Sequence, residues 1–286
     1  MGGFLIHLVT GKGGVGKSTY AAALALHLAQ SGQNTLLVEF GNRSYQRHLF
    51  QTPVGQSPVS VQSHLQLAIW DGEYCLREYL LHLLKVDRLV SLFFDNKVMR
   101  SLVQAAPALR ELALLGKLTS RERRVGPALN FETIVVDAYA TGHFRALWRA
   151  ARGMAEAIPF GPMGEQSRSM EKVLSDSSKV QFHIVATPEE LPVTEGLELA
   201  DDIAKELKQT AHFVLNRMLK VDITTEQLRL LKDNEFAKYV EILLERQQQA
   251  EQQVRTKALP ISFLPWEFVE SPTERIRQLA QKVVLT

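Results

Sequence analysis

The chain has 286 residues, of which 45% are hydrophobic and 22% are charged, and its formal net charge at pH 7 is +2. This composition is that of a soluble globular protein, and the near-neutral charge provides no overall field that would attract nucleic acid or anionic lipid. A single cysteine, Cys75, excludes a disulfide framework and a cysteine-based metal site within one chain, and it fits a reducing cytoplasm. The apolar region 76–94 contains five charged residues, which excludes an ordinary membrane span.

Short apolar, β-branched runs that end in polar residues predict the strands of this protein. They are residues 4–9, 35–39, 65–70, 133–137, 181–187, 212–216 and 260–264. Helical patterns lie between most of these runs, and strands that alternate with helices form βαβ units with a parallel sheet. We therefore expect a doubly wound, three-layer α/β fold with a mostly parallel sheet of about seven strands. We expect one domain over residues 1–286.

The helices are predicted from alanine- and leucine-rich or amphipathic stretches. Residues 18–31 form the first helix, with Gly32 as its C-terminal cap. Residues 74–124 are expected to be a helical insert between the third and fourth predicted strands. Residues 224–257 predict one or two exposed helices, and the proline- and glycine-rich stretch 158–164 predicts a loop.

The strongest motif is TGKGGVGKST at residues 10–19. Within it, the segment from Gly11 to Ser18 fits the phosphate-binding pattern G-x-x-x-x-G-K-[ST], directly after a predicted strand and before a predicted helix. Lys17 is expected to neutralise the β- and γ-phosphates, and the Ser18 hydroxyl to ligate Mg²⁺. The predicted nucleotide-binding residues here are Gly11, Lys12, Gly13, Gly14, Val15, Gly16, Lys17, Ser18 and Thr19.

A second lysine, Lys12, has no task in an ordinary phosphate loop. The run KGGVGKS resembles the deviant loop of the class of ATPases that includes ArsA, MinD, ParA, the nitrogenase iron protein and the Get-type targeting ATPases. In that class the additional lysine reaches the nucleotide of a partner subunit. The resemblance therefore implies a homodimer that encloses ATP, with Lys12 acting in trans. The alternative is a solvated surface lysine.

The stretch FETIVVDAYATGHFRAL, residues 131–147, resembles the ArsA/Get-type segment written D-T-A-P-T-G-H. This implies that Asp137 holds a water bound to Mg²⁺ at the end of a strand. Thr141, Gly142 and His143 match the second switch loop of the family. Tyr139 and Ala140 replace its usual Ala-Pro.

Three later segments extend the resemblance to ArsA-like ATPases. FHIVATPEELPVTEGLELADDI matches a strand followed by a helix with an E-x-P-V-x-E-type run, and HFVLNRM matches a strand that ends in Asn. The family role carried to Asn216 is recognition of adenine, for which an amide supplies a donor and an acceptor. ISFLPW matches the last strand and the loop over the base, which makes Pro265 and Trp266 candidates for the adenine cover. Core packing is the alternative for Trp266.

The first switch departs from the family pattern. Relatives carry an aspartate after the second strand, in a run such as S-T-D-P-A-H, whereas this chain has Gly41 at that place and Glu39 two residues earlier. A glycine cannot orient water, and the loss of a positioned polar group commonly costs ~10²–10⁴ in rate. Either Glu39 takes over this role in a weak ATPase, or the chain is a nucleotide-gated binding or scaffolding protein without useful hydrolysis.

Partners are predicted from what the chain has and lacks. One cysteine is too few for the arsenite chemistry of the family or for its zinc-clamped dimers. The apolar stretch 75–94 either packs against its own neighbours or receives a hydrophobic helix of a membrane-protein client. The amphipathic helix after Ser271 either covers the sheet or anchors the protein peripherally to a membrane, as in the MinD branch. The sequence contains no recognisable element that would contact nucleic-acid bases, so we expect no nucleic-acid partner. For the function, a MinD/ParA-like positioning ATPase is the remaining alternative.

Overall fold

The structure is a computed structural model that describes residues 4–84, 107–127, 129–221, 227 and 234–285. An eight-stranded sheet has the order β3-β4-β2-β5-β1-β6-β7-β8, and within it only β3 and β4 pair in antiparallel orientation. The strands are β1 (Leu5–Gly11), β2 (Thr35–Phe40), β3 (Val59–Gln62), β4 (Leu65–Trp70), β5 (Thr133–Asp137), β6 (Val180–Ala186), β7 (His212–Met218) and β8 (Ile261–Pro265). The predicted α/β fold with a mostly parallel sheet is confirmed.

Strand β3 is the one element of the sheet that the sequence did not predict. Its four residues are mostly exposed, and Val61 packs only partly against the core, so the run VSVQ has a much smaller apolar face than the other strands. It is held instead by backbone pairing with β4 at the edge of the sheet. A short exposed edge strand of this kind leaves almost no signal in the sequence.

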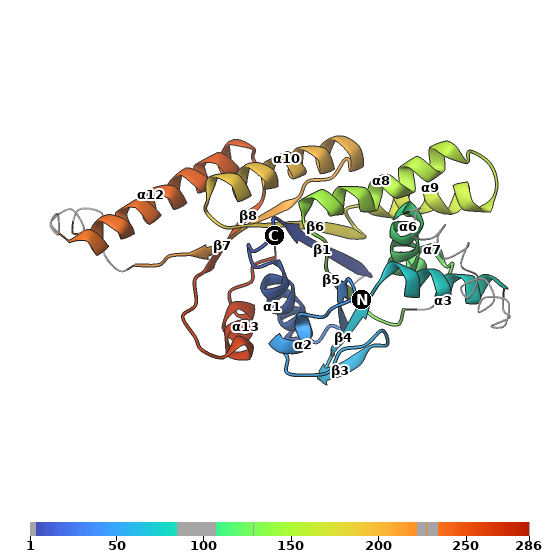
Figure 1. Cartoon of the computed structure of the whole chain (residues 1–286), viewed down its shortest axis with the longest axis horizontal. Coiled ribbons are helices and arrows are strands. Elements are labelled where there is room, and N and C mark those ends of the chain that lie inside the picture. Colours follow the sequence, from blue (N-terminus) through green and yellow to red (C-terminus); the bar gives the residue numbers. More distant parts are fainter. Residues whose placement is uncertain (1–3, 85–106, 128, 222–226, 228–233, 286) are drawn as a thin grey trace.

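Helices cover both faces of the sheet and form three layers with it (Figure 1). One face carries α1 (Lys17–Gln30), α2 (Gln46–Leu49) and α13 (Pro272–Ala280). The other carries α3 (Gly72–Leu84), α6 (Pro107–Leu118), α7 (Ser120–Arg123), α8 (Thr141–Ala157), α9 (Pro162–Leu174), α10 (Glu190–Leu207) and α12 (Glu235–Thr256). Each face has its own apolar core, and the central strands are buried between the two.

Several predicted helix ends are found. Helix α1 ends at Gln30 and is followed by Gly32 with φ 86°, as expected for a C-terminal glycine. Ser271 caps α13, since its hydroxyl accepts a hydrogen bond from the N–H of Glu274. The predicted loop 158–164 is too long, because α9 already begins at Pro162, a residue type that suits the first helical position.

The apolar stripe of α13 packs onto α1 and lies buried in the core of that face. The stripe consists of Ile276, Leu279, Ala280 and, just after the helix, Val283. This is the sheet-covering arrangement predicted for the tail. No helix in the described ranges is long and apolar enough to cross a membrane.

The described parts of the predicted insert are helical. They are α3, α6 and α7, and α6 contributes four buried leucines to the same core as β4 and β5. This part of the insert therefore packs against its own neighbours. The rest of the predicted apolar stretch, from residue 85 on, lies outside the described residues.

Three histidines lie side by side in the middle of the sheet, below Tyr20 of α1. The rings of His7 and His183 are joined by a hydrogen bond of 2.9 Å, and the Tyr20 hydroxyl lies 3.0 Å from the other nitrogen of His183. His212 follows on β7 and is hydrogen-bonded to the hydroxyl of Ser262. Burial lowers the pKa of all three histidines, that of His7 to about 4. The fold therefore requires them to be neutral.

We expect stability to fall on acidification because of this histidine row. The unfolded chain takes up a proton at His7 near its ordinary pKa of 6.5, whereas the folded chain does so only near 4, so stability is present above 6.5 and is lost as the pH falls towards 4. Between pH 7.5 and 5.0, His7 alone accounts for a loss of about 2 kcal/mol in the free energy of unfolding. Urea unfolding at the two pH values measures this loss.

The variant His7→Gln keeps a neutral hydrogen-bonding group but cannot titrate, and it should lose about 2 kcal/mol less than the wild type over this interval. His48→Gln, at an exposed histidine on α2, is the matched control and should retain the wild-type difference. An equal loss in His7→Gln and the wild type would contradict the assignment.

Candidate functional site

The phosphate loop, Gly11–Ser18, turns from the end of β1 into α1 at the carboxyl edge of the sheet. Two of its glycines are required by close contacts. A Cβ on Gly11 would overlap with the carbonyl oxygen of Val185 on β6, and one on Gly16 would overlap with the side-chain amide of Asn216. Both glycines also have positive φ, 144° and 92°, where other residues are strained. The loop is therefore fitted closely onto β6 and β7.

The other predicted residues of the loop lie where the motif requires them. Gly13 and Gly14 are exposed at its tip, and Val15 is buried beneath it. Thr19 lies in the first turn of α1, directly after Ser18. The backbone amides at the start of α1 thus follow directly from the loop, which is the arrangement that binds phosphate.

Asn216 holds the phosphate loop to the sheet. It lies near the end of β7, is buried, and its Nδ2 donates a hydrogen bond of 2.8 Å to the carbonyl oxygen of Val15. The β7–β8 pairing shifts register between Leu215 and Met218, and Arg217 has φ 58°. Such irregularities re-aim a side chain next to a site. The amide thus touches the predicted nucleotide site, and its role in adenine recognition stays a prediction.

Pro265 ends β8, and the chain after it forms an exposed aromatic pair. The backbone N–H of Trp266 donates to the carbonyl of Met218, and its ring stacks on Phe268 with 5.3 Å between ring centroids. Trp266 is 48% exposed, which excludes the core-packing alternative. Phe268 was not predicted from the sequence. Its spacing of two residues from Trp266 in an extended loop is compatible with stacking of the two rings.

The base of the site is formed by two charged residues and a hydroxyl group, those of Lys17, Asp137 and Ser18. Lys17 donates a hydrogen bond of 3.0 Å from Nζ to the carbonyl of Lys12, and burial lowers its pKa while Asp137 opposes that shift. Asp137 is buried at the end of β5, and its pKa is raised to about 6, mainly by burial, with hydrogen bonds from Ser18 and Gln46 acting in the opposite direction.

These residues fit a magnesium ion. A hydroxyl and a carboxylate are hard oxygen donors, and Mg²⁺ is usually held by one or two such groups together with substrate phosphates. The raised pKa of Asp137 shows a buried carboxylate that lacks sufficient positive charge around it, a deficit that a divalent cation would remove. Ser18 and Asp137 are thus the residues that would hold the metal, as predicted from the sequence.

Glu39 holds the first switch, the segment that follows β2, by hydrogen bonds to its backbone. Its carboxylate is buried at the end of β2 and accepts hydrogen bonds from the backbone N–H groups of Tyr45, at 2.8 Å, and Gln46, at 3.2 Å. Glu39 therefore fixes the start of α2, and its predicted role in orienting water stays untested. Gly41, at the place of the family aspartate, has φ 144°, and a Cβ on it would meet nothing within 4 Å.

Lys12 does not point into its own phosphate loop. Its ammonium group is paired with the carboxylate of Glu195 on α10, and the side chains of both residues are about one-third exposed. Glu195 also accepts a hydrogen bond of 3.2 Å from the hydroxyl of Thr141, at the start of α8. The pKa of Glu195 is lowered, mainly because Lys12 donates a hydrogen bond to its carboxylate. One carboxylate thus joins the phosphate loop to the second switch.

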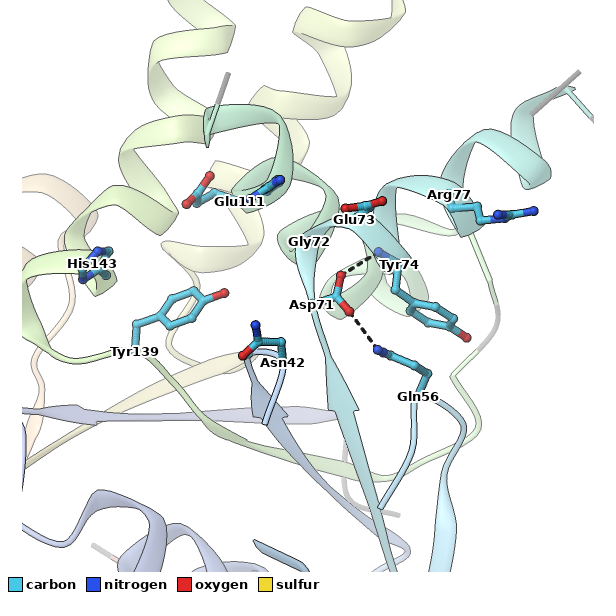
Figure 2. A pocket seen from close by; sticks show the side chains of 12 residues that line it. Asn42, Gln56, Asp71, Gly72, Glu73, Tyr74, Arg77, Glu111, Tyr139 and His143 are labelled. Carbon is cyan, nitrogen blue, oxygen red and sulfur yellow. Dashed lines mark hydrogen bonds between the residues drawn. The ribbon is translucent and has the colours of Figure 1, made fainter. Parts of the chain in front are cut away.

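A cavity of about 800 Å³ opens beside the site, between the two switches and the insert. Figure 2 shows Asn42 of the first switch and Tyr139 and His143 of the second switch facing residues of α3 and α6 across it. Burial raises the pKa of Tyr139 to about 12, and Glu111 adds to this effect. None of the residues that line the cavity belongs to the phosphate loop. The cavity therefore lies between the two switches and the insert.

Comparison with known proteins places these features in a family. The family model for anion-transporting ATPases matches residues 5–159. The ATPase BagA of Mycobacterium tuberculosis is 30% identical over 253 residues, which cover 82% of this chain and 71% of that protein. A putative arsenical pump-driving ATPase of Halobacterium salinarum is 28% identical over 83% of this chain and 39% of its own length. The arsenical pump-driving ATPase of Escherichia coli is 26% identical over 73% of this chain and 39% of its own length.

The matched region contains the phosphate loop, both switches and the described parts of the insert. The similarity to the mycobacterial ATPase extends over most of both chains. The chain therefore belongs to the anion-transporting ATPase family and is a nucleotide-binding ATPase.

Proposed function

We propose that this chain is a magnesium-dependent ATPase that closes as a homodimer around ATP, with Lys12 of each subunit acting on the nucleotide of the other. The observation that carries the proposal is the direction of the Lys12 side chain. It is held at the surface by Glu195, outside its own phosphate loop. A cation in that place is available to a second molecule, because an ion pair at the surface is worth only about 0–1 kcal/mol.

Within each subunit, the roles follow from the contacts of the site. The glycines of the loop and the start of α1 bind the phosphates, and Lys17 leaves the carbonyl of Lys12 to neutralise them. Magnesium, when bound, neutralises phosphate charge and is held by Ser18 and Asp137. The exposed rings of Trp266 and Phe268 supply a stacking surface for adenine next to Asn216.

Hydrolysis is proposed to be slow, because the first switch has no side chain at Gly41 and Glu39 is engaged by two backbone N–H groups. Phosphoryl transfer depends mainly on positioning and charge, so the lysines and the metal still provide much of the catalysis. Gly41 also favours a second function, a nucleotide-gated binding protein that does not hydrolyse ATP at a useful rate. Single-turnover release of phosphate separates the two.

A hydrophobic client helix is proposed to bind at the insert. The support is a small apolar cavity of about 70 Å³ between α3, α6 and α9, which would receive single side chains of a client; its lining includes Leu76, Leu112, Met163 and Met170. The larger cavity of about 800 Å³ is lined by both switches and by other residues of α3 and α6, so nucleotide-driven movement of the switches would reach the insert.

The dimer can be measured by light scattering in the presence of a slowly hydrolysed ATP analogue and magnesium. We expect the wild type to be monomeric without nucleotide and dimeric with it. Glu195→Gln removes the charge that competes for Lys12, so this variant should dimerise at a several-fold lower protein concentration. Glu198→Gln makes the same change one turn away, at an exposed residue, and should behave like the wild type.

A wild type that stays monomeric under saturating ATP and magnesium would contradict the proposed function. If Glu195→Gln and Glu198→Gln dimerise alike, the ion pair does not restrain Lys12.

Restoring the family aspartate at position 41 should not restore fast hydrolysis. With φ 144°, a side chain at this position strains the backbone, which costs about 1–3 kcal/mol. We expect Gly41→Asp to lower the free energy of unfolding by this amount without raising the single-turnover rate. Gly41→Ala, which has the same strain but no carboxylate, should lose equal stability. A faster Gly41→Asp enzyme with wild-type stability would show that only a side chain was missing.

A further inference from the structure

The first switch contributes one buried polar side chain to the predicted magnesium site, and that side chain is Gln46. It is the first residue of α2 and is only 1% exposed. Its position is fixed from the backbone, because Glu39 accepts the N–H groups of both Tyr45 and Gln46. The backbone of Gln46 is therefore held in place by Glu39, and its side chain points into the protein.

The amide of Gln46 contacts both predicted metal-binding residues of the chain. Its Nε2 donates hydrogen bonds to Oδ2 of Asp137, at 3.0 Å, and to the backbone carbonyl of Ser18, at 3.1 Å. These two bonds link the first switch, the end of β5 and the start of α1. The carboxylate of Asp137 is thereby held in one orientation.

The other end of the same amide is unsatisfied. Oε1 of Gln46 is buried and has no hydrogen-bond partner among the described residues. An unpaired buried acceptor costs roughly 1–3 kcal/mol, so such groups usually have a partner in the working state of a protein. The free oxygen belongs to a side chain that already touches the predicted metal site, so the missing partner is a donor that arrives with the ligand.

We propose that Gln46 is a positioning residue of the magnesium site, which holds Asp137 through Nε2 and accepts a hydrogen bond from an ordered water of that site through Oε1. This inference rests on the proposed function. An amide suits the place because it donates and accepts without charge. A third carboxylate there would place another negative charge beside Asp137 and Glu39.

The inference also explains how a switch without a side chain at Gly41 still contributes to the site. The polar group is supplied five residues later, from the first turn of α2, and Glu39 anchors the backbone of that turn. Gln46 therefore connects the first switch to Asp137 by a direct hydrogen bond.

The test is a magnesium titration of the protein bound to a fluorescent ADP analogue, next to the affinity for the analogue in EDTA. Removing a partner that orients a metal ligand typically costs 10–100-fold in metal affinity. We expect Gln46→Leu to need about 10–100-fold more magnesium for half-saturation, with unchanged affinity in EDTA. Gln46→Asn keeps an amide but is one methylene shorter, and it should show the same loss if the leucine variant does not fold.

Gln209→Leu is the matched control, since Gln209 is a buried glutamine whose amide donates to the backbone carbonyl of Leu174 at the amino edge of the sheet, opposite the site. It should titrate like the wild type. The inference is overturned if both Gln46 variants keep the wild-type magnesium midpoint, or if they lose affinity equally with and without magnesium. A wild type that binds the analogue without any effect of magnesium contradicts the proposed function itself.

Discussion

The hydrogen bond from Asn216 to the carbonyl of Val15 is the contact on which the site depends. It connects the phosphate loop to β7, one strand beyond the contact between Gly11 and Val185 of β6. Because the loop is held at both places, the start of α1 has a fixed direction, and Ser18 faces Asp137 at the end of β5. Parallel strands end at one edge of the sheet, so segments far apart in the sequence meet there.

Several charged and polar groups of the site bind one another. Lys17 binds the carbonyl of Lys12, Lys12 binds Glu195, and Gln46 binds Asp137. In the proposed function Lys17 exchanges its contact for a phosphate and Lys12 exchanges Glu195 for the nucleotide of a partner subunit, whereas Gln46 keeps its hydrogen bond to Asp137. Release of Glu195 and retention of the Gln46 contact would then convey the nucleotide state to the two switches.

The sequence predicts those parts of the structure whose signals are local. The glycine pattern of the loop, the apolar strand before Asp137 and the capping residues around Ser271 are each contained in a few residues. Strand β3 was missed because it has only four residues and they are mostly exposed. Gln46 and Glu195 were missed because each acquires its role from a contact across the fold, 91 residues to Asp137 and 183 residues to Lys12. The histidine row also exists only when β1, β6 and β7 are side by side.

The most direct measurement of the central claim is hydrolysis by a mixture of two inactive variants, Lys12→Ala and Lys17→Ala. If Lys12 acts in trans, a mixed dimer has one intact site, with Lys17 from the Lys12→Ala subunit and Lys12 from its partner. The account predicts that the mixture releases phosphate faster than the sum of the two variants alone. A mixture that is no faster than this sum, although the two variants form mixed dimers, would contradict it.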